Sequence, residues 1–154
     1  MLQEGDPAPD FEMKDSSGKT WTLAELKGRK VILYFYPADD TPGCTKESCD
    51  FRDSSADLDA AGYTILGVSP QGAASHQRFA QKYSLNFPLL IDEDMVATRS
   101  FGAFKDMGEY EGIPLRVKRS TFVIDEDGRI AVAEYGVKAG GHVERLRQKL
   151  GVGV

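Results

Sequence analysis

Continuous apolar runs alternate with polar stretches along the chain, and this alternation predicts a parallel sheet. The run from Val31 to Phe35 is apolar throughout, which is typical of a strand buried on both faces. Tyr63–Ser69 predicts a second strand of this kind, the alanine-rich segment Ala73–Tyr83 predicts a helix, and a short strand follows at Pro88–Asp92. Strands that alternate with helices in this order form parallel sheets.

The segment between the first two strands predicts a long helix that begins near Thr41. The hydroxyl of Thr41 is suited to cap that helix, Pro42 fits its first turn, and Gly62 fits its end. The helix would therefore begin just beyond the carboxyl end of a buried strand, where open α/β sheets bind their ligands.

Two hairpins and a closing helix are predicted outside this unit. Near the N-terminus, Asp15–Gly18 separates two short runs of β-favouring residues. Later in the chain, Asp125–Gly128 separates Ser120–Ile124 from Arg129–Tyr135, which indicates an antiparallel hairpin. The last predicted element is an amphipathic helix over His142–Leu150.

The order of these elements predicts a thioredoxin-like α/β fold. We expect a central mixed sheet flanked by helices, with an N-terminal β-hairpin extension, as one domain over residues 1–154. Residues 94–119 have a weaker pattern, which predicts only a short helix at Met95–Phe101 and a glycine-punctuated loop. Because this fold carries several thiol chemistries, the fold alone does not name a reaction.

The composition is that of an ordinary globular domain and excludes several classes of protein. The chain is 41% apolar and 28% charged, with a net charge of -5. This acidic balance argues against a nucleic-acid partner, and the short basic pair Arg116 and Lys118 is predicted to be a solvated strand edge. No apolar run has the length of a signal-peptide core or a membrane span. We therefore expect a cytoplasmic protein without a membrane partner.

The two cysteines, Cys44 and Cys49, are the first candidates for chemistry. A cytoplasmic chain of this size needs no disulfide scaffold, so the two thiols are either inert core residues or reactive groups. Cys44 falls in the first turn of the predicted helix, where backbone N–H groups and the helix dipole stabilise a thiolate. Taken alone, Cys44 fits a small buried apolar residue equally well.

The neighbours of Cys44 favour chemistry. The segment PADDTPGCT resembles the active-site segment of peroxiredoxins, which has Pro, three residues, Thr or Ser, two residues and Cys. The resemblance implies that Cys44 is the peroxidatic cysteine, that Thr41 holds the peroxide and that Pro37 shields the thiolate from water. The family also has a distant arginine, which Arg119 of KRSTFVID matches. A guanidinium suits this role because its rigid fork of donors can serve sulfur and peroxide together.

The position of Cys49 makes the resemblance more specific. Two cysteines five residues apart in one helix resemble the bacterioferritin comigratory proteins, or Q-type peroxiredoxins, in which the second cysteine resolves the sulfenic acid of the first. The resemblance covers nearly the whole chain, although Pro70 and Gly72 depart from it in the loop after the second strand. It implies a monomeric thiol peroxidase that reduces hydrogen peroxide and organic hydroperoxides without a cofactor. Thioredoxin, or alternatively glutaredoxin, would reduce its disulfide.

The sequence gives less support to other functions. A thiol-disulfide oxidoreductase of the same fold would use Cys-x-x-Cys, and a copper-binding assembly factor would also need a closer cysteine pair. His76 and His142 are predicted to lie on exposed helices and to form no metal site with the cysteines. No nucleotide-binding glycine motif is present, and several aromatic residues are expected in the core: Trp21, Phe35, Phe79, Phe87, Phe101 and Phe122.

Overall fold

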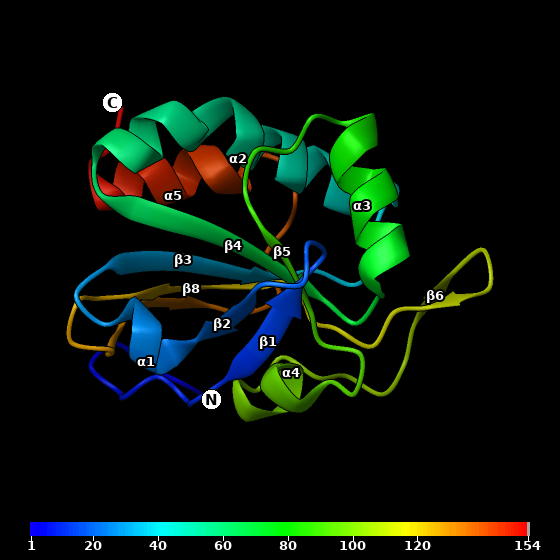
Figure 1. The fold of residues 1–154 in the computed structure, drawn as a ribbon, viewed down its shortest axis with the longest axis horizontal. Helices are drawn as coiled ribbons and strands as arrows, with labels where there is room; N and C mark the ends of the chain where they lie inside the picture. Colours follow the sequence, from blue (N-terminus) through cyan, green and yellow to red (C-terminus); the bar gives the residue numbers. More distant parts are fainter. Residues whose placement is uncertain (154) are drawn as a thin grey trace.

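A seven-stranded sheet with helices on both faces forms the body of the protein (Figure 1). The computed structural model describes residues 1–153. The strands are β1 (Glu12–Asp15), β2 (Thr20–Thr22), β3 (Lys30–Phe35), β4 (Tyr63–Ser69), β5 (Leu89–Ile91), β6 (Glu109–Tyr110), β7 (Ile113–Pro114), β8 (Ser120–Ile124) and β9 (Ile130–Glu134). The helices are α1 (Leu23–Leu26), α2 (Pro42–Ala60), α3 (Ala73–Lys82), α4 (Val96–Ser100) and α5 (His142–Leu150).

The strand order of the large sheet is β2-β1-β5-β4-β3-β8-β9. β3, β4 and β5 run parallel, while β8 and β9 run antiparallel to their neighbours. The predicted βαβ unit and C-terminal hairpin are therefore confirmed, and so is the mixed sheet of a thioredoxin-like fold. β3 lies between β4 and β8, and its residues from Val31 to Phe35 are fully buried. This burial explains why the sequence of β3 is apolar without alternation.

Two parts of the fold go beyond the sequence prediction. The N-terminal hairpin is present, but β1 also pairs with β5, so the hairpin extends the main sheet. The loop predicted after α4 contains a small hairpin of β6 and β7, which extends from the body in Figure 1. Strands of two residues are too short to produce a periodic pattern, and this is why the prediction missed them.

Two apolar clusters fill the two sides of the sheet. α1 and α4 lie on one side, and α2, α3 and α5 lie on the other (Figure 1). The aromatic residues predicted for the core are buried, except for Phe87, which is half-buried against the second cluster. Gly67 in β4 gives room to the Tyr34 ring, because a Cβ atom there would lie 2.9 Å from it. Within residues 1–153, no helix has the length and apolar character needed to cross a membrane.

The prediction that both histidines lie on exposed helix faces is wrong. His76 in α3 has no exposed surface, and His142 at the start of α5 is 1% exposed. Both rings face the sheet side of their helices, where each finds a polar partner, Asp39 for His76 and Thr121 for His142. A polar side chain can be buried when it is hydrogen-bonded, and both histidines are. Their polarity alone was therefore not a sufficient reason to predict exposed positions.

Candidate active site

Cys44 lies where the central strand gives way to α2. β3 ends at Phe35, the chain passes through the segment Pro37–Thr41, and α2 begins at Pro42. Cys44 is the third residue of the helix, and its side chain is 1% exposed. Cys44 therefore lies in the first turn of the helix, where the helix dipole favours negative charge, and its burial shields the sulfur from bulk water and strengthens electrostatic contacts with it.

The guanidinium of Arg119 contacts this sulfur. Its Nη2 donates a hydrogen bond to Sγ of Cys44 over 3.3 Å. Arg119 precedes β8, and the antiparallel pairing of Ser120 with Phe35 places it beyond the carboxyl end of β3. The pairing of the two strands thus brings together residues that are 75 positions apart in the sequence.

The carboxyl group of Glu47 contacts the same guanidinium through its other terminal nitrogen. Nη1 of Arg119 lies 2.7 Å from Oε1 of Glu47, whose carboxylate has no exposed surface. Burial alone would lower the pKa of Arg119, but the charges of Glu47 and Cys44 raise it, so the guanidinium remains a cation. The sequence reasoning missed Glu47. Its position three residues after Cys44, on the same face of α2, was the available signal.

The second oxygen of Glu47 has no hydrogen-bond partner within the described residues. Nε2 of His142 lies 3.9 Å from this oxygen, but it already contacts the hydroxyl of Thr121 at 2.8 Å. Burial raises the pKa of Glu47 to about 7, although Arg119 limits the rise. Burial also lowers the pKa of His142, so its ring is neutral at neutral pH. The Glu47 carboxyl group therefore titrates near neutral pH.

Gly43 allows the guanidinium to lie close to the start of α2. A Cβ atom at this position would lie only 3.0 Å from Nη2 of Arg119, a distance shorter than ordinary carbon contacts allow. The glycine in the segment PGC therefore lets the arginine approach the backbone beside Cys44.

Thr41 and Pro37 belong to the segment that leads into α2, but Thr41 does not cap the helix as predicted. It occupies the N-cap position without a side-chain capping bond, and its hydroxyl donates to the carbonyl of Ala38 over 2.9 Å. The carbonyl of Thr41 still accepts the first helical bond, from Thr45. With its hydrogen engaged, the buried hydroxyl retains lone pairs that can accept a hydrogen bond. Pro37 is buried.

Cys49 lies in the second turn of α2, and its side chain is half-buried. Both cysteines are free thiols, and the helix runs without a break from Pro42 to Ala60. The residues around Cys49 are fixed to the sheet, because Ser48 shares a hydrogen bond of 2.8 Å with the Tyr34 hydroxyl and Phe51 stacks on the Tyr34 ring. The structure is therefore that of the dithiol form.

The described residues contain no group of three His, Cys, Asp or Glu side chains placed to hold a metal ion. The chemistry that the site itself offers is that of a buried sulfur held by a cation at a helix start. Such an arrangement stabilises negative charge on the sulfur and on an atom bonded to it.

Comparisons with known proteins identify relatives along the whole chain. Residues 4–133 match the AhpC/TSA family. A putative peroxiredoxin of Mycobacterium tuberculosis is 47% identical over 98% of this chain and 96% of its own length. A PrxQ variant from Xylella fastidiosa has a TM-score of 0.89 and 32% identity over 98% of this chain and 96% of that chain. The bacterioferritin comigratory protein of Xanthomonas campestris, known from trapped intermediate and ligand complexes that bear on its alkyl peroxide reduction activity, has a TM-score of 0.86 and 34% identity over the same shares.

The raised pKa of Glu47 predicts a pH dependence of stability. The folded protein keeps the Glu47 proton up to about pH 7, whereas the ordinary pKa is 4.5. The contribution of this group to stability is therefore fully present below pH 4.5 and is lost as the pH rises to about 7. We expect Glu47→Gln, which keeps an acceptor for Arg119, to remove this decline. Urea unfolding at several pH values measures it.

The matched control is Glu144→Gln, which changes an exposed carboxylate in the first turn of α5. Its free energy of unfolding should follow that of the wild type at each pH. A Glu47→Gln protein with the same pH slope as the wild type would show that Glu47 does not titrate in this range.

Proposed function

Since the chain belongs to the AhpC/TSA family and is a thiol-dependent peroxidase of the Bcp and Q type, we propose that Cys44 is its peroxidatic cysteine. The observation that carries this assignment is the hydrogen bond of 3.3 Å from Arg119 to the buried Cys44 sulfur. A thiolate so placed attacks the terminal oxygen of a hydroperoxide. The S–O bond forms as the O–O bond breaks, and the leaving oxygen takes the electron pair and a proton to become water or an alcohol.

The other site residues divide the work of this step. Arg119 stabilises the thiolate and the charge that develops on the leaving oxygen, because its fork of donors can reach both. Thr41 aligns the peroxide through its hydroxyl oxygen, which stays available as an acceptor while its hydrogen is bonded to Ala38. Pro37, which is buried, shields the thiolate from water. Glu47 holds Arg119 in place.

Cys49 then resolves the sulfenic acid. Its thiol attacks the Cys44 sulfur, an S–S bond forms, and the hydroxyl group of the sulfenic acid leaves as water. We propose that thioredoxin, or alternatively glutaredoxin, reduces this disulfide. The substrates are hydrogen peroxide and organic hydroperoxides, in line with the alkyl peroxide reduction named for the Xanthomonas campestris protein.

The proposed catalytic cycle also has consequences for the oligomeric state and the cellular location of the protein. Both cysteines lie in one helix, so the reaction needs no residue from a second chain, and we propose that the protein acts as a monomer. The disulfide must be reduced in every turnover, which a reducing compartment supports. This requirement favours a cytoplasmic location.

Forming the disulfide requires the start of α2 to unwind. Five residues along an α-helix advance about 7.5 Å and turn through about 500 degrees, which leaves the two Cα atoms roughly 8 to 9 Å apart. A disulfide tolerates at most about 7 Å between Cα atoms. The helix cannot stay intact and be bridged, and Gly43 lowers the cost of melting its first turn.

The assignment of Cys44 predicts the loss of peroxidase activity in Cys44→Ser. We expect peroxide consumption with a thioredoxin system to fall below about a hundredth of the wild-type rate, a barrier increase of about 3 kcal/mol or more. The matched variant Cys49→Ser should reduce one equivalent of peroxide per chain and then stop. Residual activity of Cys44→Ser above a hundredth would refute the assignment.

The unwinding predicts different amide protection in the two redox states. On oxidation, the amides of Gly43–Phe51 should lose protection from hydrogen exchange. The amides after Phe51 should keep it, because the buried side chain of Leu58 holds the later turns of α2 on the sheet. Mass spectrometry confirms the disulfide in the same sample. Cys49→Ser treated with one equivalent of peroxide is the control and should keep its protection. Equal protection of the dithiol and disulfide forms would rule out the unwinding.

A further inference from the structure

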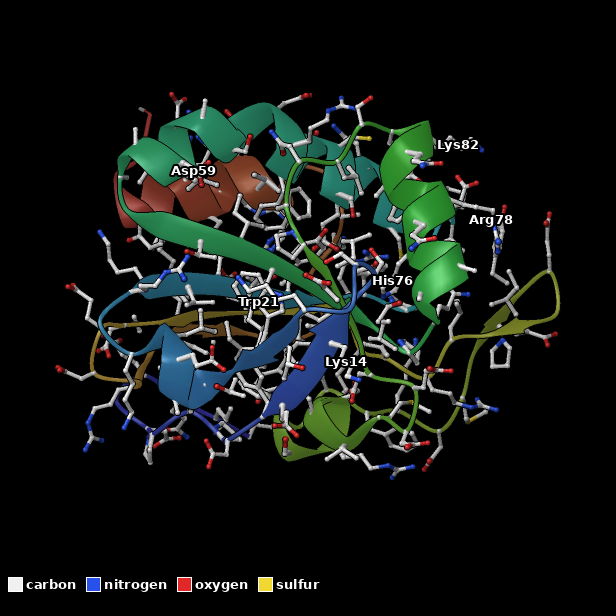
Figure 2. The ribbon with its side chains drawn as sticks, in the orientation of Figure 1. Lys14, Trp21, Asp59, His76, Arg78 and Lys82 are labelled. Carbon is white, nitrogen blue, oxygen red and sulfur yellow. The ribbon has the colours of Figure 1, made fainter. Side chains whose placement is uncertain are left out.

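A buried pair of Asp39 and His76 joins the active-site segment to α3. Nδ1 of His76 lies 2.6 Å from Oδ2 of Asp39, and the exposed fractions of the two side chains are 0% and 3%. Figure 2 shows His76 on the side of α3 that faces the sheet, whereas Arg78 and Lys82 project from the outer side. Asp39 lies midway between Pro37 and Thr41, so the pair is attached to the segment that leads into the active-site helix.

The hydrogen-bond partners of the His76 ring show which atoms it contacts and that Nε2 is a donor. Its Nε2 lies 2.9 Å from the carbonyl oxygen of Leu90, which can only accept, so Nε2 carries a hydrogen. The other ring nitrogen, Nδ1, shares a hydrogen bond of 2.6 Å with the Asp39 carboxylate. The same carboxylate accepts from the hydroxyls of Tyr36 at 2.6 Å and Ser75 at 2.8 Å. Donors thus surround Asp39, and both ring nitrogens of His76 are used.

The backbone of Asp39 is also held by a residue next to α3. Its N–H donates to the side-chain oxygen of Gln71, which lies just before α3. The next residue, Asp40, has a left-handed backbone with φ of 60° and pairs with Lys82 and Tyr83 at the exposed end of α3. The side chain and the backbone of Asp39 therefore attach the segment before Thr41 to α3, while the exposed ion pair of Asp40 contributes little to this attachment.

The other side of Thr41 is built differently. α2 begins with Pro42 and Gly43, has no side-chain cap, and in the proposed cycle must unwind through Cys49. A segment that is fixed on one side of Thr41 and opens on the other can return Cys44 to the same place after each reduction. The segment before Thr41 is therefore fixed to α3, whereas the first turn of α2, which must move, has no side-chain cap.

From this placement we propose that His76 is a positioning residue of the peroxidase reaction. Through Asp39 it holds the segment Pro37–Thr41 on α3, so that Thr41 and Cys44 meet the peroxide in a fixed geometry while α2 opens and closes. The proposal rests on the assignment of Cys44 and Thr41 made above. His76 itself does not touch the substrate.

A double-mutant cycle tests this role. The proteins compared are the wild type, Asp39→Ala, His76→Leu and the double variant, each also carrying Cys49→Ser so that only the first oxidation is measured. Each single change leaves a buried polar partner without its counterpart, whereas the double change removes both. The two readouts are the rate constant for reaction with hydrogen peroxide and the rate of alkylation of Cys44 by iodoacetamide, which needs no alignment by Thr41.

We expect each single variant to react with peroxide about tenfold more slowly or worse, because small misplacements of reacting groups are costly. The rate of alkylation should change by less than about threefold. The double variant should be less impaired than the product of the single effects. His76→Gln keeps a donor toward Asp39 or Leu90, so it should recover part of the rate and is the variant to use if His76→Leu does not fold.

Lys82→Gln is the matched control, because it removes the exposed ion pair to the neighbouring Asp40 on the same helix. Exposed pairs contribute little, so its peroxide rate should stay within about twofold of the wild type. Single variants with wild-type peroxide rates, multiplicative effects in the cycle, or equal losses in both readouts would overturn the proposal. A reference protein that does not react at Cys44 would instead reject the proposed function itself.

Discussion

The hydrogen bond between Arg119 and the Cys44 sulfur is the interaction on which the remaining site depends. The guanidinium lies between the Cys44 sulfur and Glu47, whose buried carboxyl group accepts a hydrogen bond from the opposite side of the fork. The pairing of β8 with β3 delivers the arginine to this place, and Gly43 leaves room for it beside the helix start. Strand pairing, a glycine and a buried carboxylate therefore all serve one contact with sulfur.

The proposed catalytic cycle places two opposed requirements on the start of α2. Peroxide reduction requires Cys44 to sit in a fixed place at the start of an intact α2, whereas disulfide formation requires that start to unwind. The structure distributes its contacts accordingly. Asp39 is held by His76, Ser75 and Tyr36 before the helix, and Phe51 in the middle of α2 stacks on the Tyr34 ring. Between these two anchors, the helix begins without a side-chain cap.

The sequence predicted structure best where a residue pattern is compatible with only one environment in the fold. The apolar run Val31–Phe35 predicted a central strand because only burial on both faces tolerates such a run. Glu47 and His76 escaped prediction because polar residues on a helix are expected to face water, and only the tertiary structure shows the partners that allow their burial. The hydroxyl of Thr41 could equally reach the helix or the preceding loop, and local sequence does not distinguish the two bonds.

The account depends on the geometry of the guanidinium and not on its charge alone, and Arg119→Lys separates these two properties. The measurement is the rate constant for oxidation of Cys44 by hydrogen peroxide in stopped flow, with Arg116→Lys as the control from the same segment. We predict that Arg119→Lys reacts about tenfold more slowly or worse, because an ammonium keeps the charge but cannot contact sulfur, peroxide and Glu47 through one rigid fork. Arg116→Lys should react at the wild-type rate. An unchanged rate in Arg119→Lys would contradict the account.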